Sequence, residues 1–314
     1  MPSQVVCVAS WNTDLTIRIP RPLRKGETLL GSGFEQGPGG KGSNATIACA
    51  RQGVSTAIVA RIGDDDFGRN GLTLWASEGI DTTAVVVAPG ERSGVAQILI
   101  YADGDNSIAV APGAGAGLHA RHLVDRRDLL QSASVVMASN EVPESARLQA
   151  FELAKASPQG VITLLNPAPA QALSAELLAC CDVLTPNEHE LRAMMGASDA
   201  DDLHEVAARI MQSLPALKAL VVTLGAKGCG LWHREGPQLQ CTHIPGLAVA
   251  HIEDTVGAGD TFTGALAAAR AKGMGWEASA RHANAAAALS VTGRGAIGGM
   301  PTWAQTQALL AQQG

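Results

Sequence analysis

Short β-branched runs alternate with alanine- and leucine-rich helical patterns along most of this 314-residue chain. The alternation is typical of βαβ units, in which helices connect parallel strands and cover the sheet. We expect strands at 5–9, 56–62, 134–138, 160–165, 183–185 and 219–223. We expect helices at 43–51, 68–78, 143–156, 188–196, 202–214, 261–272 and 276–291. The pattern therefore predicts the α/β class, as a three-layer α/β/α fold with a mostly parallel sheet.

Three strand-like segments break this alternation, because no helical pattern lies between them. They are residues 15–19, 27–35 and 94–111. We predict that they form a small separate sheet, a lid over the carboxyl ends of the main strands, inserted at about 14–36 and 94–112. Neither a Ser/Gly linker nor an internal repeat divides the sequence, so we expect a single domain, 1–314, that carries this lid.

Charge and cysteine spacing exclude several classes of protein. Lys and Arg number 23 against 29 Asp and Glu, which gives a net charge of −6, and no basic run appears. Nucleic acid and membranes are therefore not expected partners. The first residues do not form the basic and apolar regions of a secretory signal, and no apolar run reaches the roughly 18 residues of a membrane span. The six cysteines lack metal-ligand spacing, which favours buried free thiols in the cytoplasm, with a redox role for Cys180–Cys181 as the alternative.

Glycine is in excess, and one glycine-rich segment has two interpretations. The chain has 35 glycines, about 11% against an average near 7%. Residues Gly37–Gly42 match G-x-G-x-x-G, and Asp64 follows about 20 residues later, as in an NAD-dependent oxidoreductase. However, the first strand of the main sheet lies far upstream, and the segment before Gly37 belongs to the lid-like strands. We favour a turn that binds an anion or hydroxyl groups, with Lys41 and Asn44 facing the ligand.

A second glycine-rich segment opens the helical pattern at 261–272. Gly257, Ala258 and Gly259 leave backbone N–H groups free at a helix N-terminus, which suits a transferring phosphoryl group. Asp260 lies in the same turn and could accept a proton from a substrate hydroxyl. The alternative for Asp260 is a helix N-cap. The phosphate site beside it favours catalysis.

These two segments belong to a longer series of motifs that runs along nearly the whole chain. In this order the sequence resembles the ribokinase-like carbohydrate kinases, the B-type phosphofructokinase family. The motifs are Asn12-x-Asp14, Gly39-Gly40-Lys41-Gly42-Ser43-Asn44, Arg61-Ile-Gly-Asp-Asp, Asn166-Pro-Ala-Pro-Ala, Thr185-Pro-Asn187-Glu-His-Glu190, Thr223-Leu-Gly225-Ala-Lys-Gly228 and Gly257-Ala-Gly-Asp260.

The resemblance implies a role for each matching residue. Asp260 would be the base, and Gly257, Ala258 and Gly259 would hold the phosphoryl group. Mg²⁺ would be organised by Glu190 through water. The sugar would be held by Asn12, Asp14, Gly40, Lys41, Asn44 and Glu141. The nucleotide would be held by Asn187, Thr223, Gly225, Gly228, Gly259 and Asn284, the last with an internal hydrogen bond as its alternative. K⁺ would be held by Asp254, Val256, Ser290, Gly293 and Gly295.

The implied activity is ATP-dependent phosphorylation of the primary 5-hydroxyl of D-ribose by a homodimer that pairs through its lid. Another kinase of the family, acting on a nucleoside, a ketohexose or a deoxy-sugar, is the alternative, and a non-catalytic sugar sensor is a second one. Two positions depart from the family: Gly299 stands where Ser is frequent, and Trp11 replaces a smaller aliphatic residue. The triplet Asp64–Asp66 resembles a metal cluster, but its place after a strand favours a structural turn.

Overall fold

The computed structural model describes residues 4–236 and 238–313, and its largest element is an eight-stranded sheet in the order β14-β13-β12-β11-β10-β9-β1-β4. Six neighbouring strands are parallel, and the two at one edge are antiparallel. This arrangement confirms the predicted fold class. The strands are β1 (Val5–Val8), β4 (Thr56–Val59), β9 (Val135–Ser139), β10 (Ile162–Asn166), β11 (Val183–Leu184), β12 (Ala219–Thr223), β13 (Cys229–Glu235) and β14 (Gln238–Ile244).

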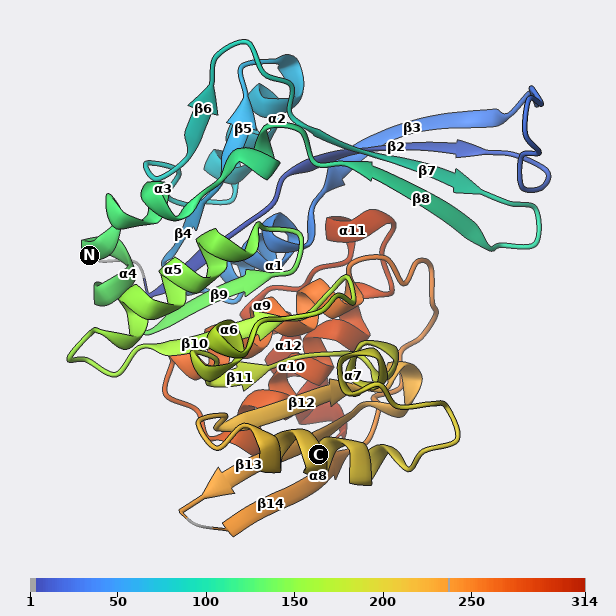
Figure 1. Ribbon diagram of the computed structural model, residues 1–314. Coiled ribbons are helices and arrows are strands. Elements are labelled where there is room, and N and C mark those ends of the chain that lie inside the picture. The colour runs from blue at the N-terminus through green and yellow to red at the C-terminus, as the bar shows by residue number, and fades with distance from the viewer. Residues whose placement is uncertain (1–3, 237, 314) are drawn as a thin grey trace.

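Helices cover both faces of this sheet, because its central strands are apolar on both sides. All four residues of β1 are buried, and its neighbours β4 and β9 are buried along their full length. One hydrophobic cluster joins the sheet to α1, α9 and α10, and the second joins it to α5, α6 and α8 (Figure 1). The helices are α1 (Lys41–Arg51), α2 (Asp66–Ser77), α3 (Ala120–Val124), α4 (Arg127–Ser132), α5 (Glu144–Lys155), α6 (Ala175–Ala179), α7 (Glu188–Met195), α8 (Leu203–Ser213), α9 (Ala258–Ala271), α10 (Trp276–Ser290), α11 (Gly295–Gly298) and α12 (Trp303–Gln313).

The lid-like segments form a separate four-stranded sheet, which projects from the large sheet in Figure 1. Its order is β3-β2-β7-β8, from β2 (Asn12–Arg18), β3 (Ser32–Gly39), β7 (Gly94–Ile100) and β8 (Asn106–Ala111). Strand β2 begins only four residues after β1 ends, so the small sheet starts at the carboxyl end of a central strand. Residues 27–31, predicted as strand, lie outside β3. The description of the chain as one domain with an inserted lid stays a prediction.

Some elements differ from the predictions. The expected strand 56–62 is two strands, because the chain leaves the large sheet at Ala60, and β5 (Arg61–Gly63) pairs with β6 (Val86–Ala88) instead. The β13–β14 hairpin and α12 were not predicted. The helix α1 starts at Lys41 rather than at 43, and α9 starts at Ala258 rather than at 261. Both differences place candidate site residues in the first turn of a helix.

Two smaller predictions can also be compared with the structure. Asp65 caps α2, where its carboxylate accepts the Gly68 N–H at 2.9 Å, and Asp66 pairs with Arg69, so the triplet is a structural turn as expected. The described cysteines are all free. However, only four are buried, since Cys180 is half-buried and Cys241 is exposed. Among the described residues, no helix combines the length and the apolar character needed to cross a membrane.

Candidate active site

The candidate residues gather where parallel strands end. Asn12 follows β1, Glu141 follows β9 and Asn187 follows β11, and carboxyl ends of parallel strands meet at one edge of a sheet. The segment Gly37–Gly42 leads out of β3, which pairs antiparallel in the small sheet. It therefore lacks the parallel strand that a dinucleotide-binding turn requires, and the oxidoreductase interpretation is wrong on this point.

The first turns of α1 and α9 come together because glycines leave room for close packing. A Cβ at Gly264 of α9 would lie 2.2 Å from the Ala45 carbonyl oxygen of α1. A Cβ at Gly42 would lie 2.6 Å from the Ala9 Cα at the end of β1. Only glycine permits these approaches. They bring the Asn44 amide within 2.9 Å of the Asp260 carboxylate, 216 residues away in sequence.

Asp260 is a buried carboxylate in the centre of this arrangement, with 7% of its surface exposed. It is the third residue of α9, and the N-cap is Gly257, which makes no side-chain cap. The capping alternative is therefore wrong. Burial raises the pKa of Asp260 to about 6, while Lys41 and the Asn44 hydrogen bond act in the opposite direction. A carboxylate with this pKa is ionised at neutral pH and still basic enough to accept a proton.

Four further charged residues interact with Asp260, namely Lys41, Asp14, Glu141 and Glu190. Lys41 is the first residue of α1, and the pKa of its ammonium group is raised, mainly by Asp260 and also by Glu141, Glu190 and Asp14. Burial raises the pKa of Asp14 to about 7, and the charges of Glu141 and Asp260 add to the rise. The four predicted residues thus lie within one electrostatic cluster, in which one cation offsets several carboxylates.

Glu141 is fixed in place by two donors. Its carboxylate accepts hydrogen bonds from the Ser10 hydroxyl and from the Lys41 backbone N–H, the latter at 2.8 Å. Glu141, Asn12 and Trp11 line a cavity of about 250 Å³ at the base of the small sheet. Asp14, Lys41, Asn44 and Asp260 lie outside this lining. The predicted sugar residues therefore divide into a cavity wall and the adjoining charged cluster.

Trp11 is buried and held by three contacts. Its indole N–H donates to the Phe67 carbonyl at 2.9 Å, and its ring meets Trp75 edge-to-face at 5.3 Å. A Cβ at Gly71 would lie 2.9 Å from the ring, so a larger residue there would clash with it. The unusual aromatic residue is therefore part of a rigid wall beside Asn12.

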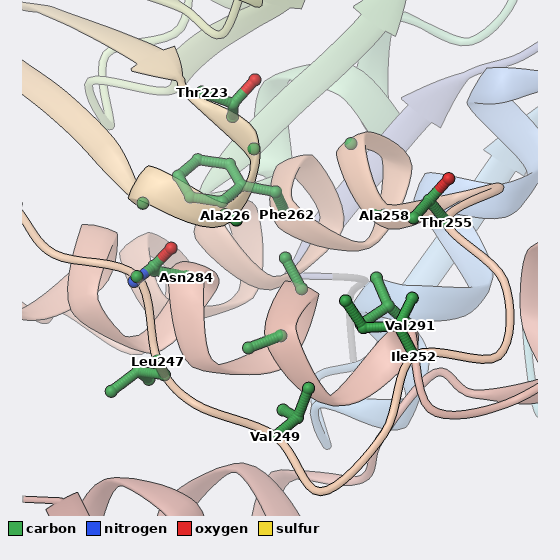
Figure 2. A pocket seen from close by; sticks show the side chains of 16 residues that line it. Thr223, Ala226, Leu247, Val249, Ile252, Thr255, Ala258, Phe262, Asn284 and Val291 are labelled. Atoms are coloured by element: carbon green, nitrogen blue, oxygen red, sulfur yellow. The ribbon is translucent and has the colours of Figure 1, made fainter.

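A larger cavity of about 380 Å³ is lined by Ala258 and Gly259, the two residues before Asp260. Figure 2 shows apolar side chains around it, with the Asn284 amide and the Thr255 hydroxyl at opposite ends. The predicted residues Thr223, Gly225, Gly228, Ala258, Gly259 and Asn284 all line it. The amide N–H of Asn284 donates to the Pro245 carbonyl at 2.9 Å, so the internal hydrogen bond and a place in the cavity are both present.

The loop before α9 has the geometry expected of a turn that needs glycine. Gly257 has φ +79°, and a Cβ there would lie 2.3 Å from the Ala296 carbonyl oxygen. Gly40, which precedes α1, likewise has φ +91°. One of the three predicted amides is partly engaged, because the Ala258 N–H donates to the Thr255 carbonyl at 3.3 Å. Gly40 and Gly257 thus each begin one of the helices that meet at Asp260.

Asn187 and Glu190 form a capping box at the start of α7. The Asn187 side chain accepts from the Glu190 N–H at 2.7 Å, and the Glu190 carboxylate accepts from the Asn187 N–H at 2.9 Å. A parallel β-bridge joins Asn187 to Thr223, which lines the 380 Å³ cavity. Both residues therefore stabilise the start of α7. In addition, the charge of Glu190 raises the pKa values of Lys41 and Asp260.

The residues assigned to K⁺ also come together. The Asp254 carboxylate accepts the N–H groups of Val256 at 3.0 Å and of Gly295 at 2.9 Å. A Cβ at Gly299 would lie 1.9 Å from the Ser290 carbonyl oxygen. A side chain at 299 would therefore displace Ser290 or Gly293, whose backbone N lies 2.8 Å from the same Cβ. Within the described residues, no group of three or more His, Cys, Asp or Glu side chains could hold a metal.

The sequence did not single out some residues of this site. Ser10 holds Glu141 across 131 residues, and Phe262 lines the larger cavity. Thr263 bonds to Thr185 at 3.2 Å and to Asn166 at 3.4 Å, which ties α9 to two strand ends. Ser10 had a sequence signal, because it directly precedes the Trp11-Asn12 pair at a strand end. Leu247, Val249 and Ile252 also line the larger cavity, but no sequence motif marked them.

Comparison with known proteins agrees with this geometry. Residues 2–303 match the family model described as pfkB family carbohydrate kinase. The chain is 36% identical over 308 residues to the ribokinase of Haemophilus influenzae, covering 98% of each protein. It is 33% identical over 300 residues to a deoxyribokinase of Salmonella typhimurium, covering 95% of each. The structure of Arabidopsis thaliana ribokinase complexed with ribose and ATP has a TM-score of 0.90 at 30% identity, covering 99% of both chains.

Proposed function

The chain belongs to the pfkB family of carbohydrate kinases, and from this premise we propose that it transfers the γ-phosphoryl group of ATP to the 5-hydroxyl of D-ribose. The observation that carries the proposal is the position of Asp260. This buried carboxylate lies in the first turn of α9, beside Asn44 and Lys41, with the 380 Å³ cavity opening at the neighbouring Gly259. A base between a sugar site and a nucleotide site is what a phosphotransferase requires.

In the proposed reaction, the 5-hydroxyl of ribose attacks the γ-phosphorus. Asp260 takes the hydroxyl proton as the new O5–P bond forms, and the bond from the γ-phosphorus to the bridging oxygen breaks, so ADP leaves with that oxygen. The first amides of α9, at Gly257 and Gly259, point partial positive charge at the transferring group. Lys41 offsets the negative charge that gathers between the substrates. The small sheet covers the site and excludes water, which would otherwise attack ATP.

We place the sugar against Asn12, Asp14, Gly40, Lys41, Asn44 and Glu141, whose amides and carboxylates can bond adjacent hydroxyl groups. We place the nucleotide in the 380 Å³ cavity, with Thr223, Gly225, Gly228 and Asn284 along it and Asn187 at its edge. The structure of the relative from Arabidopsis thaliana is a complex with ribose and ATP, which supports these two molecules as the substrates.

Two cations complete the proposal. Glu190 is the hard oxygen donor for Mg²⁺, acting through water, since Mg²⁺ characteristically keeps waters and few protein ligands. Bound Mg²⁺ supplies charge neutralisation on the ATP phosphates. The carboxylate of Asp254 and the carbonyl groups of Val256, Ser290, Gly293 and Gly295 are the oxygen donors for K⁺. Activity measured with and without K⁺ tests this assignment, since an unchanged rate would contradict it.

We also propose that two copies pair through their small sheets. The exposed residues of this sheet include Phe34 at 65% exposure and Ile108 at 57%. Exposed apolar faces and open strand edges favour pairing with an identical chain. A charge placed there by Phe34→Glu should convert a dimer into a monomer in sedimentation measurements. A wild-type protein that sediments as a monomer would contradict the proposal.

The direct test is an ATP-consumption screen over ribose, 2-deoxyribose, ketohexoses, hexoses and nucleosides. We expect ADP release with ribose to exceed release with every other acceptor, and the product to carry its phosphate at O5. Preference for 2-deoxyribose would move the substrate towards the deoxyribokinase relatives and leave the kinase assignment intact. Ribose binding without ADP release would favour a sugar sensor instead.

A further inference from the structure

Asn140 is a buried residue whose backbone and side-chain polar groups all have hydrogen-bond partners. Its backbone N–H donates to the Ala168 carbonyl at 3.0 Å, and its side-chain N–H donates to the Pro169 carbonyl at 2.9 Å. Its carbonyl accepts from the Gln171 amide at 3.0 Å, and its side-chain oxygen accepts from Arg147. The residue is 6% exposed. Such a saturated, buried amide fixes the backbone on both of its sides.

Arg147 adds a buried charge to this group of hydrogen-bonded residues, which we call the Asn140 node. It lies on α5 with 2% of its surface exposed, and burial lowers the pKa of its guanidinium group. Its nearest carboxylate is Glu144 at 4.0 Å, and its Nε has no hydrogen-bond partner among the described residues. A buried arginine without a close ion pair is costly. Stability alone therefore does not account for it, and among the described residues its guanidinium group has one hydrogen bond, to the Asn140 side chain.

The node adjoins Glu141, which follows Asn140 directly. Glu141 and Val142 line both the 250 Å³ cavity and a further cavity of about 300 Å³, which is also lined by Asn140 and Arg147. There is thus open space behind Glu141. Ser10 and Lys41 hold its carboxylate from the front, and Asn140 holds its backbone from behind. Without Asn140, the Glu141 backbone could shift towards the 300 Å³ cavity.

We propose that Asn140, braced by Arg147, is a positioning residue that holds Glu141 against the sugar and so sets the affinity for the sugar. The inference rests on the proposed function, because it assumes that Glu141 contacts the acceptor. It also gives a role to the Asn166-Pro-Ala-Pro-Ala motif, whose Ala168 and Pro169 carbonyls receive both Asn140 donors. A misplaced binding group loses contacts that are equally strong in the ground state and the transition state, which raises KM and leaves kcat unchanged.

The test compares Asn140→Ala with wild type for the sugar that wild type phosphorylates best. We expect the KM for the sugar to rise about tenfold or more, with the KM for ATP and kcat changed less than threefold. Arg147→Gln keeps a hydrogen-bond donor and removes the charge, and we expect a smaller rise in the same KM. If Asn140→Ala does not fold, the sugar KM of Arg147→Gln serves as the test.

Asp182→Asn is the matched control for lost stability. Asp182 is fully buried, and it accepts from Lys155 at 2.6 Å and from Thr163 at 3.0 Å, but it lies at the amino end of β11, away from the carboxyl ends where the site lies. We expect it to lower Tm and leave the sugar KM unchanged. An Asn140→Ala protein with a lowered Tm and an unchanged sugar KM would overturn the positioning role.

A double-mutant cycle completes the design. If Asn140 acts through Glu141, Asn140→Ala should have little further effect on the sugar KM in a Glu141→Ala background. Effects that add in full would show an independent role and overturn the proposal. Wild type without activity on any acceptor would instead refute the proposed function, so the two failures are distinguishable.

Discussion

The two ends of the site are built on different physical principles. At the sugar end, Asp14, Lys41, Glu141 and Asp260 interact as buried or half-buried charges, and the pKa values of three of them are shifted. At the proposed nucleotide end, sixteen of the described residues line the cavity, and of these only Thr223, Thr255 and Asn284 carry polar side chains. Coupled charges make single changes costly, whereas apolar contact is shared among many residues. Changes at the sugar end should therefore have far larger effects.

The largest effect is expected from Asp260→Asn. The amide keeps the size of the carboxylate and cannot accept the proton, so kcat should fall by roughly 10²–10⁴-fold. Binding of ATP should change little, because the larger cavity keeps its apolar lining. Steady-state ADP release measures kcat, and nucleotide titration measures binding. A kcat near the wild-type value would remove Asp260 from the mechanism.

Lys41→Met should come next, because Lys41 is the strongest influence that lowers the pKa of Asp260. Losing a charged hydrogen-bond donor costs about 1.5–3 kcal/mol, or roughly 10–100-fold in kcat/KM. Without the cation, the pKa of Asp260 rises above about 6, so the base is protonated over a wider range. The loss should therefore be greater at pH 6 than at pH 8. Equal losses at both pH values would contradict the electrostatic role.

Asn44→Ala tests the role of the Asp260 carboxylate by removing its neutral hydrogen-bond donor. The Asn44 amide donates to the Asp260 carboxylate at 2.9 Å and so lowers the pKa of Asp260. In wild type, kcat/KM should fall as the pH drops through about 6, because Asp260 then gains a proton. In the variant this acid limb should lie at higher pH, with about a tenfold loss at neutral pH. Lys272→Met, a surface change outside the site, should leave the profile in place.

Much of the fold followed from local pattern. The strands that carry the site were expected because short β-branched runs such as 134–138 and 219–223 stand between helical patterns. The β13–β14 hairpin was not expected, since strand β14 alternates exposed and half-buried residues and carries a weak apolar signal. The helix α12 buries only Thr306 and Leu309, so its helical pattern was also weak. Elements at the periphery were thus harder to predict than the buried layer.

The candidate residues were foreseeable where a motif marked them, and not where only tertiary contact does. Asp260 and Lys41 stand in glycine-rich turns that sequence alone displays. Ser10 bonds to Glu141 across 131 residues, and Asn140 bonds to Ala168 and Pro169 on another loop. The role of Gly264 depends on how closely α1 and α9 cross. Such roles become visible only when the chain is folded.

The smallest effect is expected at the nucleotide end, from Asn284→Ala. Asn284 loses a hydrogen bond to the Pro245 carbonyl, worth about 1 kcal/mol, so the KM for ATP should rise only about fivefold. The sugar KM should not change, because Asn284 and Thr255 lie at opposite ends of the larger cavity (Figure 2). Thr255 shortly precedes Asp260, so Asn284 lies at the end away from the proposed sugar site. Initial rates at varied ATP and varied sugar separate the two constants. A loss as large as that of Lys41→Met would show that the nucleotide end depends on one polar contact, and the contrast between the two ends would fail.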